Sequence, residues 1–511
     1  MSVPLQGSPV IDSDVDTNRF HDQPQRPTPP FASLHSHPPQ NSGPPPGPPS
    51  ARQPRTASDR SSSDPHCSHL NDIEKGLPIH AIPPLQLHEL EGNQEQRHHG
   101  DQQDKKYEAH CLEVTASSDD EESSKYNQQQ QQQKQQPKLG FRERLRHFTW
   151  AWYTLTMSTG GLSLLIYAQP HQFPGLRQVG FAVYILNIVL FVLVTSAMAA
   201  RFVLFRGALT RSLTHPREGF FVPTFFLSVA TIITSTQRYC VPEDPALAAR
   251  FAGRLVGAIR VAFWLYVALT TAVAVGQYSY LFASHHSFAL QNMMPTWILP
   301  IFPVMLSGTI ASVIAATQPP AAGVAVAVAG LTCQGLGLAV AFMMYAHVVG
   351  RLMQTGLPNR EHRTGLFMCV GPPAFTALAF IGLATGLPED FDHDLDGFVE
   401  TRIIATMGLV GAGFLWALSF WWFCIAALAV AQSPPRHFHL GWWACVFPNT
   451  GFILATISIG TCFRSEPILW LTTAASILLL ITYLFVLFHH VRAVIVQDIM
   501  YPGRDEDVED H

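Results

Sequence analysis

The long hydrophobic segments of this chain contain no aspartate or glutamate. Ten such segments lie between residues 148 and 490, and none carries an acidic side chain. Carboxylates inside a membrane are the usual sites of cation binding and proton relay. Their absence argues against a cation pump and against a protein that relays protons through its own acidic groups.

The sequence also lacks the cysteine pattern of a metal site or a disulfide framework. Its eight cysteines include no Cys-x-x-Cys pair, and six of them lie in or beside hydrophobic segments, where cysteine packs as a small apolar residue. A membrane-embedded enzyme would need convergent histidine, cysteine or carboxylate groups within the segments, and the segments do not supply them. We therefore expect no catalytic residues, no metal, no cofactor and no nucleic-acid partner.

Composition divides the chain into four parts. Residues 1–137 are rich in proline, glutamine, serine and charge, so we expect a disordered low-complexity cytoplasmic tail. Residues 138–147 form a basic juxtamembrane segment, residues 148–490 a transporter domain, and residues 491–511 a short acidic cytoplasmic tail. A scaffold role for the first part is an alternative, and deleting it should leave transport intact if the tail is only regulatory.

Each of the ten apolar segments approaches or exceeds the roughly 20 residues that a helix needs to cross a bilayer. They span residues 148–168, 178–200, 220–237, 256–284, 297–316, 322–350, 366–387, 402–431, 441–462 and 467–489. We predict an all-α membrane protein with ten transmembrane helices. The third and fifth segments are the shortest, and a hydropathy search should miss these two first.

The distribution of lysine and arginine sets the predicted orientation. With an even number of spans, the two termini lie on the same side of the membrane. Fourteen of these residues lie beside span ends on that side, and six lie beside span ends on the opposite side. Because positive residues are retained on the cytoplasmic side, both termini are predicted to be cytoplasmic.

Four prolines recur at nearly even intervals inside the apolar segments. Pro223, Pro303, Pro372 and Pro448 are separated by 80, 69 and 76 residues. In the first segment, Gly160 and Gly161 take the equivalent place. A repeat of this kind indicates one structural unit used several times, here a two-helix hairpin used five times. Since proline in a membrane helix needs a protein or water environment, we expect the odd-numbered helices to be broken and to line a central pore.

A pore without negative charge suits an anion. Interrupted helices direct a partial positive charge towards the axis, and nearby hydroxyl and amide groups add hydrogen bonds. The polar candidates are Thr156, Ser158, Thr376, Asn449 and Thr450. Arg201, Arg238 and Arg260 are candidates for guiding an anion, although arginine near a helix end commonly reaches for the interface instead.

Phenylalanines accompany the prolines. Phe447 directly precedes Pro448, Phe302 directly precedes Pro303, and Phe375 lies just after Pro372. An aromatic ring in a narrow apolar passage excludes water and acts as a gate. We predict that these three rings gate the pore, with Phe447 as the first candidate.

Five stretches of the sequence resemble the fungal malic acid transport proteins, which belong to the tellurite-resistance/dicarboxylate transporter family and are related to plant slow anion channels. They are HFTWAW at residues 147–152, LTHPRE at 213–218, ILPIFP at 298–303, GLTCQG at 330–335 and GPPAFT at 371–376. The resemblance extends over about residues 139–495.

The resemblance implies five helical hairpins around a central pore, a homotrimer, and a pore-blocking phenylalanine at Phe447. It also implies malate and other C4-dicarboxylates as substrates, carried across the plasma membrane. Sulfite-efflux relatives share the fold, so export of sulfite or another inorganic anion remains the alternative. The residues leave open whether the protein is a proton-coupled carrier or a gated channel, and in which direction it transports.

Overall fold

The computed structural model describes residues 139–284, 290, 293–387, 391 and 400–502. Every regular element in these residues is helical, and they contain no strand. The predicted tail at residues 1–137 and the residues from 503 onwards lie outside this description. The prediction of an all-α membrane protein is confirmed by the helices described below.

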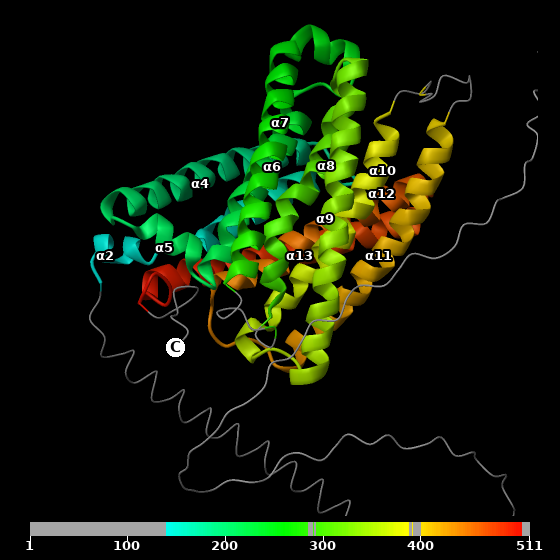
Figure 1. Ribbon diagram of the computed structural model, residues 1–511. Coiled ribbons are helices and arrows are strands. Elements are labelled where there is room, and N and C mark those ends of the chain that lie inside the picture. Colours follow the sequence, from blue (N-terminus) through cyan, green and yellow to red (C-terminus); the bar gives the residue numbers. More distant parts are fainter. Residues whose placement is uncertain (1–138, 285–289, 291–292, 388–390, 392–399, 503–511) are drawn as a thin grey trace, which may run out of the picture. The chain divides into compact units, whose positions relative to one another are not determined.

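Ten long elements form five consecutive helix pairs (Figure 1). The first members of the pairs are α3 (Tyr153–Tyr167), α6 (Val222–Cys240), α8 (Phe302–Ile314), α10 (Gly371–Thr385) and α12 (Phe447–Cys462). The second members are α4 (Leu176–Leu204), α7 (Pro245–Ala283), α9 (Pro320–Thr355), α11 (Thr401–Gln432) and α13 (Glu466–Val496). Three short helices, α2 (Phe141–Arg146), α5 (Ala208–Thr214) and η6 (Ala315–Thr317), complete the connections around these pairs.

The first members form a closed ring. Along the chain, each of α3, α6, α8, α10 and α12 packs against the next, and α12 packs against α3. Each also packs against the second member of its own pair, which lies outside the ring. The apolar windows of α6, α8, α10 and α12 are mostly buried, whereas those of the outer helices are mostly exposed. The predicted division into axial and peripheral helices is therefore present in the structure.

Nine helices in the described residues are long and apolar enough to cross a membrane. The one left out is α3, which has 15 residues and is rich in threonine, serine and glycine. We expected the third and fifth segments to be missed, and that expectation was wrong. The span that contains α6 includes the 3₁₀ helix before it, and the span that contains α8 includes a 3₁₀ helix at each end, so both spans reach 23 residues.

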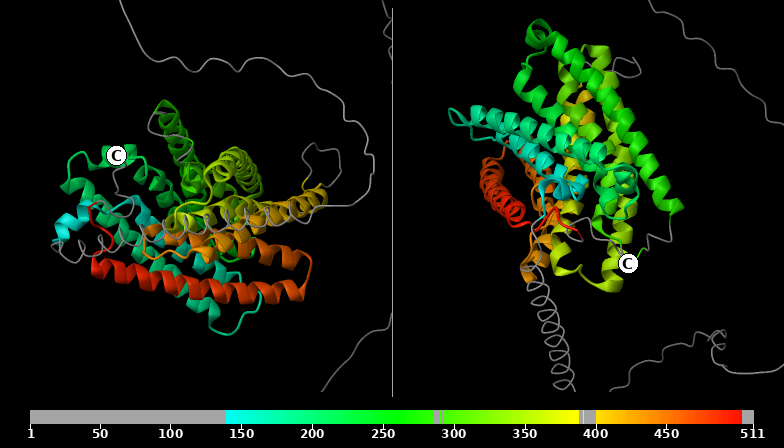
Figure 2. Two further views of the ribbon diagram at one scale, coloured as in Figure 1. Left: turned by 90° about the horizontal axis from the view of Figure 1, so that it is seen from below. Right: turned by 90° about the vertical axis from the view of Figure 1, so that its left-hand side faces the viewer.

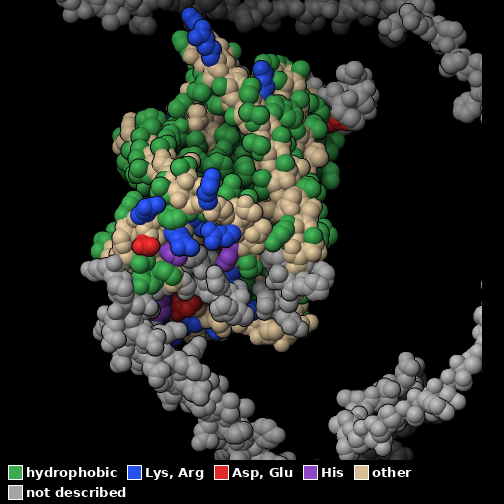
Figure 3. All heavy atoms as spheres, turned by 60° about the vertical axis from the view of Figure 1, so that its left-hand side comes forward, with side chains coloured by type: hydrophobic (Ala, Val, Ile, Leu, Met, Phe, Trp, Pro, Cys, Tyr) green, Lys and Arg blue, Asp and Glu red, His purple; other side chains and the backbone are tan. Residues whose placement is uncertain are grey.

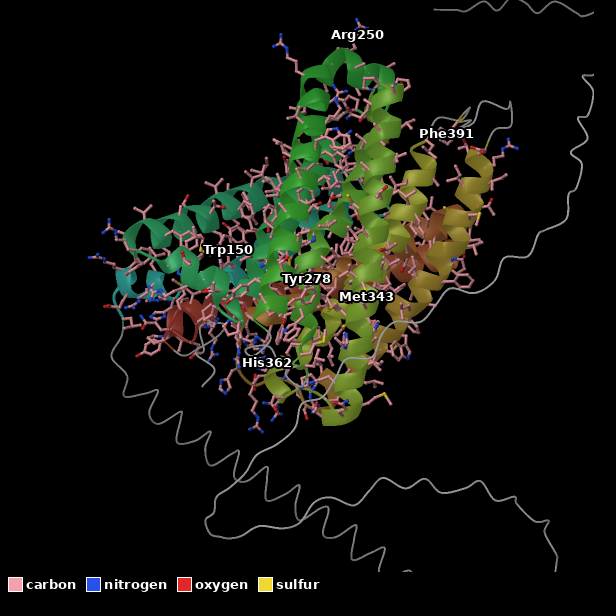
Figure 4. The ribbon with its side chains drawn as sticks, viewed as in Figure 1. Trp150, Arg250, Tyr278, Met343, His362 and Phe391 are labelled. Carbon is pink, nitrogen blue, oxygen red and sulfur yellow. The ribbon has the colours of Figure 1, made fainter. Side chains whose placement is uncertain are left out.

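The surface follows the same division. On the face drawn in Figure 3, a broad stretch of hydrophobic side chains lies between arginine side chains at the top and a second group of arginine side chains in the lower half. Figure 4 shows Arg250, near the start of α7, and His362, before α10, at opposite ends of the bundle. An apolar belt between two charged ends is the surface expected of a protein that spans a bilayer.

The two ends of the described chain meet. The Leu139 backbone N–H donates to Oε1 of Gln497 at 3.2 Å, and Arg144 donates to the Val494 carbonyl oxygen at 2.7 Å. In both views of Figure 2, the first (cyan) and last (red) described segments lie together. Both ends of the helical domain therefore lie at the same end of the bundle.

A 3₁₀ helix precedes each of the five inner α-helices. These are η1 (Trp150–Trp152), η2 (Glu218–Phe221), η5 (Pro295–Ile301), η7 (Arg360–Val370) and η8 (Leu440–Cys445). Four of them end directly before their inner α-helix, and η8 ends one residue before α12. The junction between 3₁₀ and α geometry is thus the repeated break in every inner helix.

The four repeated prolines occupy these junctions. Pro223, Pro303, Pro372 and Pro448 all lie in the first turn of their α-helix. A residue there has no intrahelical acceptor for its N–H, so proline costs nothing and fixes the backbone angle that starts the helix. The prolines therefore set the point where α geometry begins.

The two glycines of the first segment do not mark the start of their α-helix. Gly160 and Gly161 lie in the middle of α3, which runs without interruption from Tyr153. The predicted equivalence between these glycines and the prolines is wrong. The junction falls between Trp152 and Tyr153, so the place of proline in this copy is taken by Thr154.

Candidate functional site

The inner helices enclose a cavity of about 420 Å³. All five contribute to its wall, which extends along α12 from Phe447 to Cys462 and along α6 as far as Arg238. The cavity therefore lies in the half of the bundle that contains the C-terminal ends of the inner helices. No aspartate or glutamate lines it, and Arg238 is the one charged residue among its lining residues.

Three phenylalanine rings meet near the start of the inner helices. The ring centres of Phe375 and Phe447 are 5.2 Å apart, and Phe302 lies 5.8 Å from Phe375 and 6.2 Å from Phe447. Phe375 and Phe447 line the cavity, and all three side chains are almost fully buried. The structure therefore brings together the three predicted gate residues, each from a different inner helix.

Each ring rests against a glycine of the next helix in the ring. A Cβ atom at Gly371 of α10 would lie 2.5 Å from Phe302, and one at Gly451 of α12 would lie 2.5 Å from Phe375. Both distances are shorter than side chains tolerate, so only glycine fits while these rings stay in place. A Cβ at Gly161 of α3 would lie 3.3 Å from Phe447, a tight but less severe contact.

Of the five predicted polar pore residues, Thr450 lines this cavity. Thr156 instead bonds Ser228 of α6 at 2.6 Å, and Thr376 accepts a hydrogen bond from Gln334 of α9 at 2.7 Å. These bonds join neighbouring helices rather than facing the cavity. Ser158 is fully buried, and the Asn449 amide donates to the Cys445 carbonyl oxygen at 2.8 Å.

Arg201 lies in a buried ion pair. Its Nη1 and Nη2 atoms donate to the two carboxylate oxygens of Glu218 at 2.5 and 3.2 Å, and both side chains are more than nine-tenths buried. Its Nε atom donates to the Arg146 carbonyl oxygen at 3.0 Å. Ser212, which accepts from the Trp150 indole at 2.6 Å, donates to the same carboxylate at 2.9 Å.

This pair corrects the prediction that the spans are free of carboxylates. The apolar span that contains α6 begins at Glu218, two residues before the predicted start of the segment. The charge of Arg201 is compensated by Glu218, so Arg201 joins α2, α4 and η2 rather than facing the cavity. Arg260, on the outer helix α7, does not line the cavity either.

A second polar cluster joins η7 to the segment before η8. The Glu361 carboxylate accepts from the backbone N–H groups of Arg436 and His437, both at 3.1 Å. The Nε2 atom of His439 bonds the Glu361 carbonyl oxygen. Burial, followed by the neighbouring His362, lowers the pKa of His439 to about 4, and the bond to Glu361 opposes this shift.

Sequence reasoning missed Thr309 and Tyr167, both of which line the cavity. Thr309 lies two turns into α8 and Tyr167 ends α3, away from the prolines that marked the other candidates. Their spacing from the break is not repeated in the other copies, so the repeat gave no signal for them. Only the closed ring shows that these positions face the axis.

Known proteins that are similar to this chain are named as anion channels or transporters. The SLAC1 family, described as voltage-dependent anion channels, matches residues 147–491. A malic acid transport protein of Schizosaccharomyces pombe is 34% identical over 375 residues, covering 73% of this chain and 84% of the relative. A putative malic acid transport protein of the same yeast is 29% identical, over 73% of this chain and 86% of its own length.

A more distant relative has a different named substrate. The sulfite efflux pump SSU1 of Trichophyton rubrum is 26% identical over 63% of this chain and 84% of its own length. The relatives and the family are transporters or channels rather than enzymes. The chain belongs to the SLAC1 family of voltage-dependent anion channels and, as its resemblance to the malic acid transport proteins indicated, is an anion-transporting membrane protein.

Proposed function

We propose that this protein carries malate and related C4-dicarboxylate anions across the plasma membrane through the cavity between its five inner helices. The observation that carries the proposal is the charge of the cavity wall, which includes an arginine and no carboxylate. A low-dielectric passage with one positive charge attracts anions and repels cations. The named activity of the two malic acid transport relatives supports dicarboxylates as the substrate.

The gate in this proposal is the phenylalanine cluster. Phe447 and Phe375 close the cavity near the start of the inner helices, and Phe302 packs against both. A hydrated dicarboxylate cannot pass three contacting rings, so transport requires at least one ring to move. Phe447 is the first candidate for the ring that moves, because its contact with Gly161 is less tight than the contacts of Phe302 and Phe375 with their glycines.

The proposal includes ten membrane crossings with both termini in the cytoplasm. Nine crossings would leave the chain ends on opposite sides, yet Leu139 and Gln497 are hydrogen-bonded to each other. This bond supports counting α3 as the tenth crossing. The excess of arginine near the chain ends supports a cytoplasmic location for them.

We further propose a homotrimer in the lipid bilayer. The outer helices leave much of their apolar surface exposed, and lipid together with neighbouring subunits would cover it. The mass of the purified protein in lipid nanodiscs tests this state directly. A monomeric mass at transport-competent concentrations would remove the trimer without affecting the proposed substrate.

Uptake of radiolabelled malate into liposomes containing the purified full-length protein tests the function. We expect saturable uptake that unlabelled succinate inhibits. The sulfite alternative, which the 26% identical efflux pump favours, predicts that sulfite competes better than succinate. Absence of malate uptake, with sulfite transport intact, would replace the first proposal with the second. Repeating the assay across pH separates a proton-coupled carrier from a gated channel.

A further inference from the structure

We propose that Arg238 and Thr309 are the two hydrogen-bond donors that hold a dicarboxylate in the cavity, one carboxylate at each. The proposal rests on the proposed function and deepens it, because it names the residues that select a substrate with two anionic groups. Both residues line the cavity, Arg238 from the last turn of α6 and Thr309 from the middle of α8.

Most hydroxyl groups around the cavity cannot donate to an anion. Seven of the lining residues each donate a hydrogen bond to a carbonyl of their own helix: Thr231, Thr234, Ser312, Thr385, Thr450, Ser458 and Thr461. A hydroxyl has one proton, so these oxygens present only lone pairs to the cavity. Lone pairs repel a carboxylate. A wall rich in threonine and serine is thus a poor anion site at most of its positions.

Thr309 is the exception among these hydroxyl residues. Its Oγ1 atom is buried and has no hydrogen-bond partner among the described residues, and the side chain is 7% exposed. An unsatisfied buried hydroxyl is costly, so such a group is retained where a partner arrives from elsewhere. A threonine hydroxyl in a helix has two ordinary χ1 rotamers, and the proposal requires the one that turns the hydroxyl to the cavity that the residue lines.

Arg238 supplies the positive charge. Its guanidinium carbon lies 5.7 Å from the centre of the Tyr167 ring, which also lines the cavity. Within the part of the chain that the structure describes, Arg238 forms no ion pair. The half-buried guanidinium therefore keeps its hydrogen-bond donors for a ligand while the aromatic ring supports it.

A neighbouring acid is already compensated by another arginine. The Tyr167 hydroxyl donates to Oε1 of Glu243 at 2.5 Å and accepts from Nη2 of Arg177 at 2.6 Å. The same Arg177 atom lies 3.8 Å from the Glu243 carboxylate. Glu243 is thus held by Arg177 and Tyr167, which leaves Arg238 available to an anion.

The two donors lie at different depths. Thr309 lies six residues after Pro303, and Arg238 lies fifteen residues after Pro223, so their Cα atoms are offset by roughly 13 Å if the two helices start level. The flexible arginine side chain spans much of that distance. A molecule with a carboxylate at each end contacts both donors, whereas sulfite or a monocarboxylate contacts one at a time.

Transport kinetics of matched variants in liposomes test the pair. We expect Arg238→Gln and Thr309→Val each to raise the KM for malate about tenfold or more, the effect of one charge-assisted hydrogen bond. The KM for propionate, a monocarboxylate, should change less than the KM for malate. Thr309→Ser, which restores the hydroxyl, and Arg238→Lys, which restores the charge, should recover part of the malate affinity.

Arg250→Gln is the matched control. It removes a positive charge from the same end of the bundle, but Arg250 does not line the cavity and its side chain is exposed. We expect malate and propionate kinetics close to those of the unaltered protein. Folding of every variant is checked by its elution profile and thermal unfolding in detergent.

Two results would overturn the proposed role of Arg238 and Thr309. One is a malate KM in Arg238→Gln and Thr309→Val equal to that of Arg250→Gln. The other is an equal increase in the KM for malate and in the KM for propionate. Such a result would indicate a general electrostatic effect or a packing defect. Malate uptake by the unaltered protein separates these failures from failure of the proposed function, because the function fails only if that uptake is absent.

Discussion

The ring of Phe375 lies directly over Gly451 of the next inner helix, where a Cβ atom would be 2.5 Å from Cε2 and 2.7 Å from Cζ of the ring. The same relationship joins Phe302 to Gly371. These aromatic side chains are therefore positioned by the absence of a side chain on a neighbouring helix. Their placement depends on that neighbour as much as on their own helix.

The change Gly451→Ala should displace the Phe375 ring. Since the ring already lines the cavity, we expect it to move into that space and to lower malate flux severalfold. The double variant Gly451→Ala/Phe375→Ala should transport like Phe375→Ala alone, because the added methyl group then meets no ring. Initial rates of malate uptake in liposomes measure all three variants.

Gly413→Ala is the control for this substitution. Gly413 lies on the outer helix α11, and a Cβ atom there meets nothing within 4 Å. Its malate flux should equal that of the unaltered protein. A Gly451→Ala protein that folds and transports equally well would show that Phe375 is free to leave its place at no cost.

Removal of the Phe447 ring should increase anion flux. Phe447 is 1% exposed and packs against Phe302 and Phe375, so Phe447→Ala opens the closed base of the cavity. We expect severalfold faster malate uptake, or a weaker preference for malate over smaller anions, in reconstituted vesicles. Unchanged flux and selectivity would remove Phe447 from the gate.

Loss of Arg201 should destabilise the protein through Glu218. Arg201→Met leaves a buried carboxylate without its partner, which costs about 3–5 kcal/mol. We expect a large drop in the thermal unfolding midpoint in detergent. The double variant Arg201→Met/Glu218→Leu removes both charges and should recover most of that loss.

Arg206→Gln provides the comparison for Arg201. Arg206 is exposed just beyond α4, and its replacement should leave the unfolding midpoint unchanged. Equal midpoints for Arg201→Met and Arg206→Gln would mean that the Arg201–Glu218 pair contributes nothing to stability.

His439 should make the protein less stable in acid. Its pKa is about 4 in the folded protein and about 6.5 in an unfolded chain. Between these values the unfolded state binds a proton that the folded state does not, so stability falls as the pH drops from 6.5 towards 4. The contribution is at most about 3 kcal/mol, at about 1.4 kcal/mol for each pH unit.

The difference between the unaltered protein and His439→Gln isolates this effect from other titrating groups. Thermal unfolding midpoints at pH 7, 5.5 and 4.5 should converge for the two proteins or cross as the pH falls. A constant difference across this range would show that His439 titrates normally in the folded state.

The repeated prolines identified the inner helices because proline constrains the backbone locally, and a local constraint is visible in the sequence. Their role was less visible, since a missing N–H is tolerated either at a kink or in a first turn. The structure places Pro223 and Pro448 in first turns. Gly160 was misplaced for the same reason, because glycine fits a break as well as a close helix contact.

The Arg201–Glu218 pair and the Phe375–Gly451 contact lay beyond sequence reasoning. Arg201 carried no sign of whether it faced an anion, lipid or a carboxylate, because its partner lies on another element. Phe375 and Gly451 are 76 residues apart and belong to different hairpins. Such contacts arise only when the hairpins are arranged around a common axis.

The contact between α12 and α3 joins the last inner helix to the first. During synthesis, four of the five walls leave the ribosome before the fifth exists, so the growing chain holds an open trough facing lipid or the insertion machinery. Thr450, which belongs to the final wall, is added only then. A chain that stops before residue 447 has most of the wall residues but no enclosed passage.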